Sequence, residues 1–132
     1  MTNKIYPKWK EAVIQGGANS SLAGTVKVAL IDAGAYAQSD AHEFLTSLAG
    51  IVGTPQTLTS KTFVGGVLDG ADVTFTAVTG PSVEAIVLYI DTGVAATSRL
   101  VAYLDSGYTN LPVTPNGGDV LITWNVAGIV GI

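Results

Sequence analysis

The chain of 132 residues contains no cysteine and only one histidine, His42. Without cysteine, neither a disulfide framework nor a thiolate metal site can form, so the stability of the fold must come from packing or from assembly. A single imidazole also excludes a zinc site built from several histidines. The lack of cysteine does not assign a redox compartment, because such a chain folds equally well in either.

Charged side chains are also scarce. They make up 12% of the chain and apolar residues 48%, whereas about a quarter of an ordinary soluble domain is charged. Either Ser, Thr and Gly provide most of the solvated surface, or part of the surface is covered by other subunits. We favour the second interpretation, in a homo-oligomer that is a dimer or trimer. No run approaches the ~20 apolar residues of a membrane-spanning helix, and the apolar stretch at residues 12–14 is too short for a signal-peptide core. We predict no membrane association and no secretion by that route.

The few charges are unevenly distributed. Residues 1–27 hold four lysines and one glutamate, a net +3, whereas residues 28–132 hold nine acids against Lys61 and Arg99, a net −7. An acidic body repels phosphate, and the lysines come without arginine or a glycine-rich cradle, so we predict no nucleic-acid binding. The basic segment has two interpretations, a solvated helix face or an arm that docks on an acidic partner.

The sequence is rich in apolar segments that end in turns. Three of them end in Asp, a small residue and Gly, at Asp32, Asp91 and Asp105. Such an ending predicts a turn, because Asp bonds the backbone ahead of it and Gly adopts positive φ without strain. Periodicity predicts strands over residues 25–31, 57–64, 67–68, 72–77, 83–90, 98–104 and 120–124. The segment 83–90 is apolar on both faces, so both must be covered. We predict a mainly β fold, an antiparallel β-sandwich of jelly-roll or Ig-like type.

Two short helices are expected outside these strands. A proline near its start, apolar residues four apart and a Gly-Gly stop predict a helix over residues 7–15. Asp40 followed three residues later by Glu43 imitates a capping box and predicts one further short helix. We therefore divide the chain into an N-terminal arm and helix over residues 1–24 and a single β-sandwich domain over residues 25–132.

The tripeptides that begin at Asp91 and Asp105 match the catalytic motif of aspartic proteases, in which two such aspartates share one proton. Two copies fourteen residues apart lie on one hairpin and cannot come from two pseudo-symmetric lobes. A dimer with one Asp per subunit would need an apolar-apolar-Gly strand followed by a helix, and residues 129–131 are followed by one residue only. Turn chemistry explains all three copies, so we predict no catalytic residue and no enzyme.

The remaining polar candidates are weaker. Asp69 and Asp72 offer two carboxylates to calcium but lack the further oxygen ligands of a dedicated loop. A Ser-His-Asp relay would have to use His42 on a helix surface, where we expect it to be solvated. Lys61 and Arg99 are isolated and are interpreted as solubilising charges. We predict no metal and no cofactor.

The large aromatic side chains leave one binding alternative open. Aromatic rings are more often core or interface residues than sugar-stacking platforms, but the sequence does not distinguish exposed rings from buried ones. The rings in question are Trp9, Tyr89, Tyr103 and Trp124.

A resemblance extends over the whole chain and rests on five segments. They are residues 5–12 (IYPKWKEA), 24–30 (GTVKVAL), 41–44 (AHEF), 69–78 (DGADVTFTAV) and 112–119 (PVTPNGGD). On these residues the chain resembles a family of small proteins encoded among the virion genes of tailed bacteriophages. The resemblance supplies no catalytic residue.

The resemblance implies a non-enzymatic virion structural protein, of head decoration or cement type, that binds and stabilises the assembled capsid. Its partner would be the major capsid protein, and it would be located in the virion, assembled in the host cytoplasm. One alternative is a tail or head-tail connector subunit. Another is a carbohydrate-binding or hydrolytic module on the virion.

The N-terminal segment is the expected docking element. In residues 1–16, the anchors would be Tyr6 and Trp9, and an acidic shell would be met by three basic side chains, Lys4, Lys8 and Lys10. The competing interpretation places Trp9 and Val13 in the core of the domain itself.

Overall fold

A computed structural model describes residues 3–131 and shows a mainly β fold of three antiparallel sheets. The largest sheet has the order β1-β7-β6-β2-β3, with β1 at Lys4–Ile5, β2 at Val26–Ile31, β3 at Ile51–Thr57, β6 at Ala85–Ile90 and β7 at Leu100–Leu104. Two ribbons pair β4 (Val67–Leu68) with β9 (Val130–Gly131) and β5 (Val73–Phe75) with β8 (Val120–Ile122). The helices described are α1 (Pro7–Gln15) and three 3-10 turns, η1 (Leu45–Ser47), η2 (Val64–Gly66) and η3 (Ala95–Thr97).

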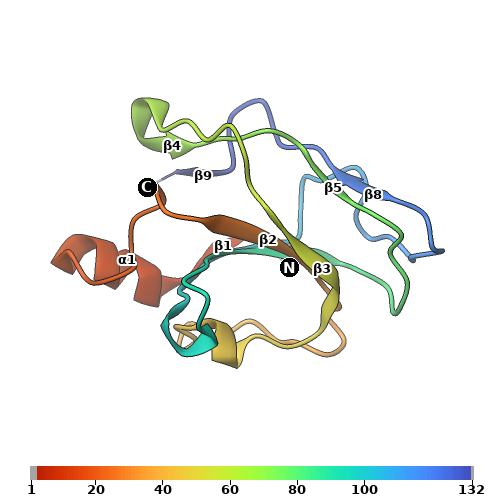
Figure 1. Cartoon of the computed structure of the whole chain (residues 1–132), viewed down its shortest axis with the longest axis horizontal. Helices are drawn as coiled ribbons and strands as arrows, with labels where there is room; N and C mark the ends of the chain where they lie inside the picture. The colour runs from red at the N-terminus through yellow and green to blue at the C-terminus, as the bar shows by residue number, and fades with distance from the viewer. Residues whose placement is uncertain (1–2, 132) are drawn as a thin grey trace.

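The ribbons and the 3-10 turns η1 and η3 lie on opposite sides of the large sheet (Figure 1). The ribbons β4–β9 and β5–β8, which we call the ribbon layer, form the upper part of that view. Helix α1 lies at one end of the sheet, below β4 and β9. The loop that follows α1 leads directly into β2.

The centre of the large sheet is apolar on both faces. All six residues of β6 and all five of β7 are buried. In the register, Val87 of β6 lies opposite Ala29 of β2 on one side and Tyr103 of β7 on the other. The two-sided apolar pattern of residues 83–90 is therefore explained by a central strand that is covered above and below.

The ribbon layer shows the alternation of a sheet with one wet face. Val73 and Phe75 are buried while Thr74 between them is exposed, and β8 repeats this pattern with Leu121 outward. Leu121 is 43% exposed, and it stands at a position where alternation would place a polar residue.

The Asp-X-Gly turns form only in part as expected, because the aspartate accepts from the glycine amide in two of them, and the glycine has positive φ at Gly93 and Gly107 (87° each) but not at Gly34. The Oδ1 atoms of Asp32 and Asp91 accept hydrogen bonds from the amides of Gly34 and Gly93 at 2.9 and 3.0 Å. At Asp105 the turn amides are held differently, because the Oδ1 of Asn3 accepts from the Asp105 and Ser106 N–H groups at 2.7 and 3.0 Å.

Two predicted elements differ from the structure. The further helix after Asp40 is only the three-residue 3-10 turn η1, and neither acid caps it. Asp40 is paired with Lys4 at 3.2 Å and Glu43 with Arg99 at 2.8 Å, so distant cations hold both carboxylates. The strand expected over residues 57–64 instead begins at Ile51 and ends at Thr57, shortly before the left-handed backbone of Ser60 (φ 54°).

The edges of the large sheet are short or irregular. Strand β1 has only two residues. The opposite edge strand, β3, contains Gly53 at φ 72° and Pro55, and its register with β2 shifts between Val28 and Leu30.

The N-terminal segment belongs to the same packed body as the strands. Lys4 lies opposite Tyr103 in the sheet, and Tyr6 and Trp9 are part of the one core cluster that includes β2, β6 and β7. The expected boundary at residue 24 therefore does not separate two bodies in the structure.

Candidate functional site

Tyr6 is the innermost member of a hydrogen-bonded chain of side chains. Its hydroxyl lies 2.6 Å from that of Tyr36, which lies 2.7 Å from Nδ1 of His42. Burial raises the pKa of Tyr6 far above its ordinary value, with the bond to Tyr36 as the next cause. His42 therefore terminates a buried network and does not stand on a solvated helix face as predicted. We call Tyr6, Trp9, Tyr36 and His42 the N-terminal cluster.

The two predicted anchors are buried within their own chain. Tyr6 is 0% and Trp9 1% exposed, and the Trp9 indole donates to the carbonyl of Ser20 at 2.9 Å. The cause is the pairing of β1 with β7, which continues in a bond from the Tyr6 amide to the Val101 carbonyl and directs the first turn of α1 onto the core. Neither side chain is accessible to a partner in this fold. The competing placement in the core holds for Trp9 but not for Val13, which is 36% exposed.

The three predicted lysines do lie at the surface. Lys4 is paired with Asp40 and Lys8 with Glu11, at 3.2 and 3.6 Å, with all four side chains about half exposed. Lys10 is exposed and forms no ion pair within residues 3–131. Exposed pairs of this kind are weak and exchange easily with solvent, so the charges remain accessible to a partner.

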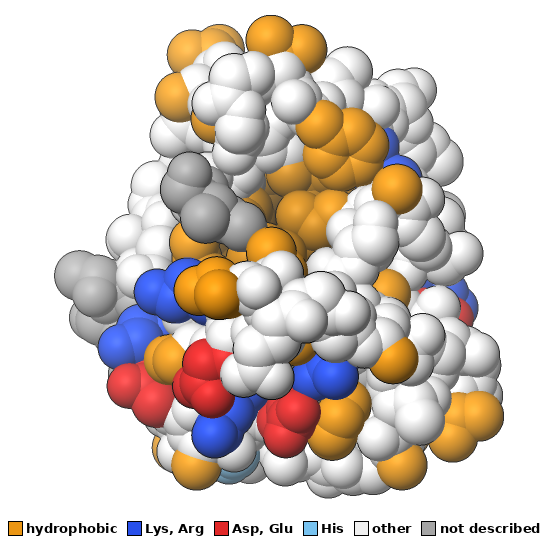
Figure 2. Space-filling model, turned by 90° about the vertical axis from the view of Figure 1, so that its left-hand side faces the viewer, with side chains coloured by type: hydrophobic (Ala, Val, Ile, Leu, Met, Phe, Trp, Pro, Cys, Tyr) orange, Lys and Arg blue, Asp and Glu red, His pale blue; other side chains and the backbone are white. Residues whose placement is uncertain are grey.

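Helix α1 also presents apolar side chains to solvent. Val13 is 36% and Ile14 84% exposed, and the neighbouring turn adds Phe63 at 50% and Val64 at 81%. Between α1 and this turn lies a hollow of about 340 Å³, whose apolar lining is Trp9, Val13, Leu22, Ala23 and Phe63. Figure 2 shows hydrophobic side chains gathered in a hollow above a band of mixed charges. We call this hollow the apolar groove.

The loop at residues 17–24, between α1 and β2, is held by side chains from distant parts of the chain. Arg99 Nε donates to the Ala18 carbonyl at 2.8 Å, and Lys61 Nζ donates to the carbonyls of Leu22, at 2.9 Å, and Gly24. The Trp9 indole holds Ser20 in the same way. We call residues 17–24 the pinned loop.

The roles of Lys61 and Arg99 correct the prediction that they only solubilise outer strand faces. The Arg99 side chain is 12% exposed and also contacts Glu43 at 2.8 Å. No spacing in the sequence points to these bonds, since Arg99 lies 81 residues from Ala18 and Lys61 37 residues from Gly24.

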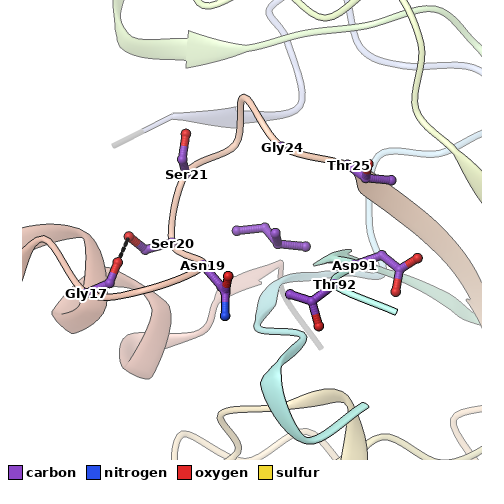
Figure 3. A pocket seen from close by; sticks show the side chains of 9 residues that line it. Gly17, Asn19, Ser20, Ser21, Gly24, Thr25, Asp91 and Thr92 are labelled. Atoms are coloured by element: carbon purple, nitrogen blue, oxygen red, sulfur yellow. Dashed lines mark hydrogen bonds between the residues drawn. The ribbon is translucent and has the colours of Figure 1, made fainter. Parts of the chain in front are cut away.

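A second hollow, of about 400 Å³, lies between the pinned loop and the turn after β6. Ile90 lines it together with six polar residues, Asn19, Ser20, Ser21, Thr25, Asp91 and Thr92. Figure 3 shows Asn19 and Ser20 on one side of the hollow and Asp91 and Thr92 on the other. We call it the polar hollow.

Asp91 is the one carboxylate among the residues that line the polar hollow. The Gly93 amide, and after it Lys27 at 3.3 Å, holds the pKa of Asp91 below its usual range. The carboxylate therefore stays ionised at neutral pH and is neutralised by a neighbouring ammonium.

The two aspartates of the protease-like tripeptides do not meet. Asp91 follows β6 and Asp105 follows β7, and these strands are antiparallel, with Ile86 opposite Leu104. The two turns therefore lie at opposite ends of the hairpin, roughly 20 Å apart at the rise of a strand. A shared proton is impossible at that separation.

Asp69 acts in a local turn, whereas Asp72 holds a residue 52 positions away in the sequence. Asp69 Oδ1 accepts from the Gly70 amide at 2.8 Å, and Asp72 Oδ1 accepts from the Trp124 amide at 3.0 Å. Within residues 3–131, no group of three His, Cys, Asp or Glu side chains could hold a metal ion.

The aromatic rings considered as sugar platforms are all in the interior. None of the four is more than 7% exposed: Trp9, Tyr89, Tyr103 and Trp124. They cannot stack on a ligand at the surface without rearrangement.

Comparison with known proteins finds no match to a protein-family model or to a curated protein. No helix within residues 3–131 has the length and apolar character needed to cross a membrane.

Proposed function

We propose that the chain is a non-enzymatic virion structural protein that decorates and stabilises an assembled bacteriophage capsid. Its partner would be the major capsid protein, and its location the virion, assembled in the host cytoplasm. The observation that supports this proposal best is the surface formed by α1 and η2, where Ile14 and Val64 are more than 80% exposed. Such side chains are enriched where a protein contacts another protein. The same surface carries Lys10, which forms no ion pair with the residues that the structure describes.

The docking surface differs from the expected one in the side of α1 that it uses. Tyr6 and Trp9 face the core, so the contact would be made by the outward residues Lys8, Lys10, Val13 and Ile14 together with Phe63. Burial of apolar surface stabilises such a contact by roughly 25 cal/mol per Å². A modest contact repeated in many copies stabilises a shell strongly.

The same exposed apolar residues support a homo-oligomer, dimer or trimer, before or after attachment. Sedimentation of the purified protein measures the oligomeric state. If a second copy binds α1 and η2, Ile14→Ser should sediment as a folded monomer.

We also propose that the large sheet and the ribbon layer together form a β-sandwich of the jelly-roll or Ig-like type. Supporting this, residues of both layers belong to one core cluster, among them Leu88, Phe75 and Ile122. An experimental structure in which the two ribbons join into one sheet facing β6 would support the sandwich, and one in which they pack apart would contradict it.

The decisive experiment is addition of the purified protein to undecorated heads. Ile14→Ser with Phe63→Ser should reduce binding at least about tenfold, because the central apolar contact is removed. The matched control is Val94→Ser, an apolar residue that is 58% exposed and does not line the apolar groove. Equal binding by the double variant, the control and the unchanged protein would contradict the proposed surface.

Electrostatic attraction to an acidic shell has a separate test. Lys8→Glu with Lys10→Glu should slow addition to heads more at low salt than at high salt, because exposed charges are screened over ~10 Å at 0.1 M salt.

Copy number in purified virions separates decoration from the alternative of a tail or connector subunit. Hundreds of copies per particle indicate decoration, whereas about six to a few dozen indicate a position on the tail axis. Quantitative mass spectrometry of virions gives this number directly.

A further inference from the structure

The backbone of the pinned loop is held by three side chains from outside the loop. Its backbone carbonyls accept hydrogen bonds from the Trp9 indole of α1, from the guanidinium of Arg99, the residue before β7, and from the ammonium of Lys61, before η2. The Ser20 hydroxyl adds an internal bond to the Gly17 carbonyl at 2.7 Å. Because the backbone of the loop is fixed from outside, its side chains face solvent in defined positions, which lowers the entropy that a bound ligand must remove.

Several polar groups on the polar hollow remain free of protein partners. Among the described residues, neither the Asn19 amide nor the Thr25 hydroxyl forms a side-chain hydrogen bond, and both residues are exposed. Ser21 Oγ accepts from the Ala23 amide, which leaves its own hydroxyl hydrogen to donate. Asn19 also holds a left-handed backbone at φ 57°, a conformation that asparagine tolerates better than most residues.

The chemistry of these groups selects the class of ligand. The ionised Asp91 disfavours an anion. A metal cation is disfavoured because Asp91 is the one carboxylate among the lining residues and Lys27 already neutralises it at 3.3 Å. Amide and hydroxyl side chains both donate and accept, as the hydroxyl groups of a polyol do. Ile90 offers an apolar lining for the C–H face of such a ligand. The volume of about 400 Å³ lies within the range of small-molecule sites.

We propose that the polar hollow between the pinned loop and the Asp91–Gly93 turn binds a neutral, hydroxyl-rich ligand, namely a single sugar residue. Asn19 and Thr25 contact ligand hydroxyls, Asp91 accepts from a further hydroxyl at the rim, and Ile90 contacts the ring face. The site uses none of the outward residues of α1 and none of the buried aromatic rings. It therefore stands or falls separately from the proposed attachment to a capsid.

An NMR titration of the full-length, ¹⁵N-labelled chain tests the site. The probes are the methyl glycosides of glucose, galactose, mannose, rhamnose and N-acetylglucosamine, each added to well above millimolar concentration. At least one should shift the amide signals of residues 17–25 and 90–93 with a Kd on the order of millimolar. No shift with any probe would overturn the proposal, as would shifts confined to the apolar groove.

Two substitutions remove ligand contacts while preserving the backbone. Asn19→Gly suits the positive φ, and Thr25→Val keeps the shape of the side chain, so both variants should melt as the unchanged protein does. Each should weaken sugar binding about tenfold, as expected for one lost hydrogen bond. The matched control is Asn125→Gly, in an exposed loop residue outside the hollow. Unchanged affinity in both site variants would overturn the assignment.

The ligand class has its own test. Sodium acetate and calcium chloride are titrated under the same conditions, as probes for an anion and a cation. Neither should shift the signals of Asn19 and Thr25. A shift of these signals by either salt, without a shift by any sugar, would overturn the neutral class of ligand.

Discussion

The N-terminal cluster and the ribbon layer each contain one of the two tryptophans, and the two indoles are used in the same way. Trp9 donates to the Ser20 carbonyl at 2.9 Å and Trp124 to the Ala71 carbonyl at 2.8 Å. The separation in sequence differs. The Trp9 bond spans 11 residues, whereas the Trp124 indole bond spans 53 residues and the bond from its amide to Asp72 spans 52. The same kind of bond therefore fixes a nearby loop in one region and joins two distant segments of the chain in the other.

The largest expected effect tests whether the N-terminal cluster is as much a part of the fold as the ribbon layer. Trp9→Ala and Trp124→Ala should each lower the free energy of unfolding by about 3–5 kcal/mol, because a large buried side chain is removed. Urea denaturation measures both, and Ile14→Ala, at an 84% exposed position, is the control with an effect within about 0.5 kcal/mol. A loss below about 1 kcal/mol for Trp9→Ala alone would show that residues 1–16 are an independent arm.

The hydrogen-bonded chain of the N-terminal cluster should be more sensitive than the turns of the ribbon layer. Tyr36→Phe removes the middle hydroxyl and leaves the buried Tyr6 hydroxyl without its partner, so unfolding should become easier by about 1–3 kcal/mol. Asp72→Ala removes only the acceptor for the part-buried Trp124 amide and should cost about 1 kcal/mol. Equal losses in the two variants would erase this difference between the regions.

Alkaline pH should destabilise both regions through their tyrosines. Burial raises the pKa of Tyr108, beside Trp124, to about 12, and it also raises the pKa of Tyr36. A raised pKa means that the fold favours the neutral phenol. This stabilisation is therefore complete below about pH 10, the unfolded pKa, and is lost as the pH rises toward 12.

Thermal melts between about pH 9 and 12 measure this loss. Tyr108→Phe should reduce the alkaline loss of stability that comes from Tyr108 and leave the loss that comes from Tyr36 and Tyr6. A phenolate absorbance that appears with the pKa of free tyrosine, in a chain that is still folded, would contradict the buried placement of these rings.

The smallest expected effect lies at Asp91, outside both regions. Its pKa is lowered by the Gly93 amide and then by Lys27, so the stabilisation from its ionised form is present above about pH 3.9 and is lost as the pH falls through the lower folded pKa. Asp91→Asn should flatten the acid limb of the stability curve and change neutral stability by no more than about 1 kcal/mol. A steeper acid limb in the variant would contradict the assignment.

Much of the fold follows from local sequence rules. Alternation predicted β5, a two-sided apolar run predicted β6, and the Gly16 stop of α1 is a left-handed C-cap at φ 66°. These features depend on residues within a few positions of each other. They can therefore be recognised without knowledge of the partner strand.

The contacts of the candidate sites could not be predicted in this way. Asp40 and Glu43 have the spacing of a capping box, yet they are paired with Lys4 and Arg99, and the second of these pairs spans 56 residues. Lys4, Lys8 and Lys10 lie at the surface. The burial of Tyr6 was not predicted, because it depends on Tyr36, a residue that becomes its neighbour only in the folded chain.

The two edges of the large sheet have a consequence for behaviour at high concentration. An open strand edge can template pairing with another molecule, and this leads to fibrous aggregates. Here one edge is only two residues long, and the other is interrupted by the irregular register opposite Gly53 and has no N–H at Pro55. Neither edge offers a long, flat row of free amides, so molecules crowded side by side can associate through their side-chain surfaces without polymerising through their backbones.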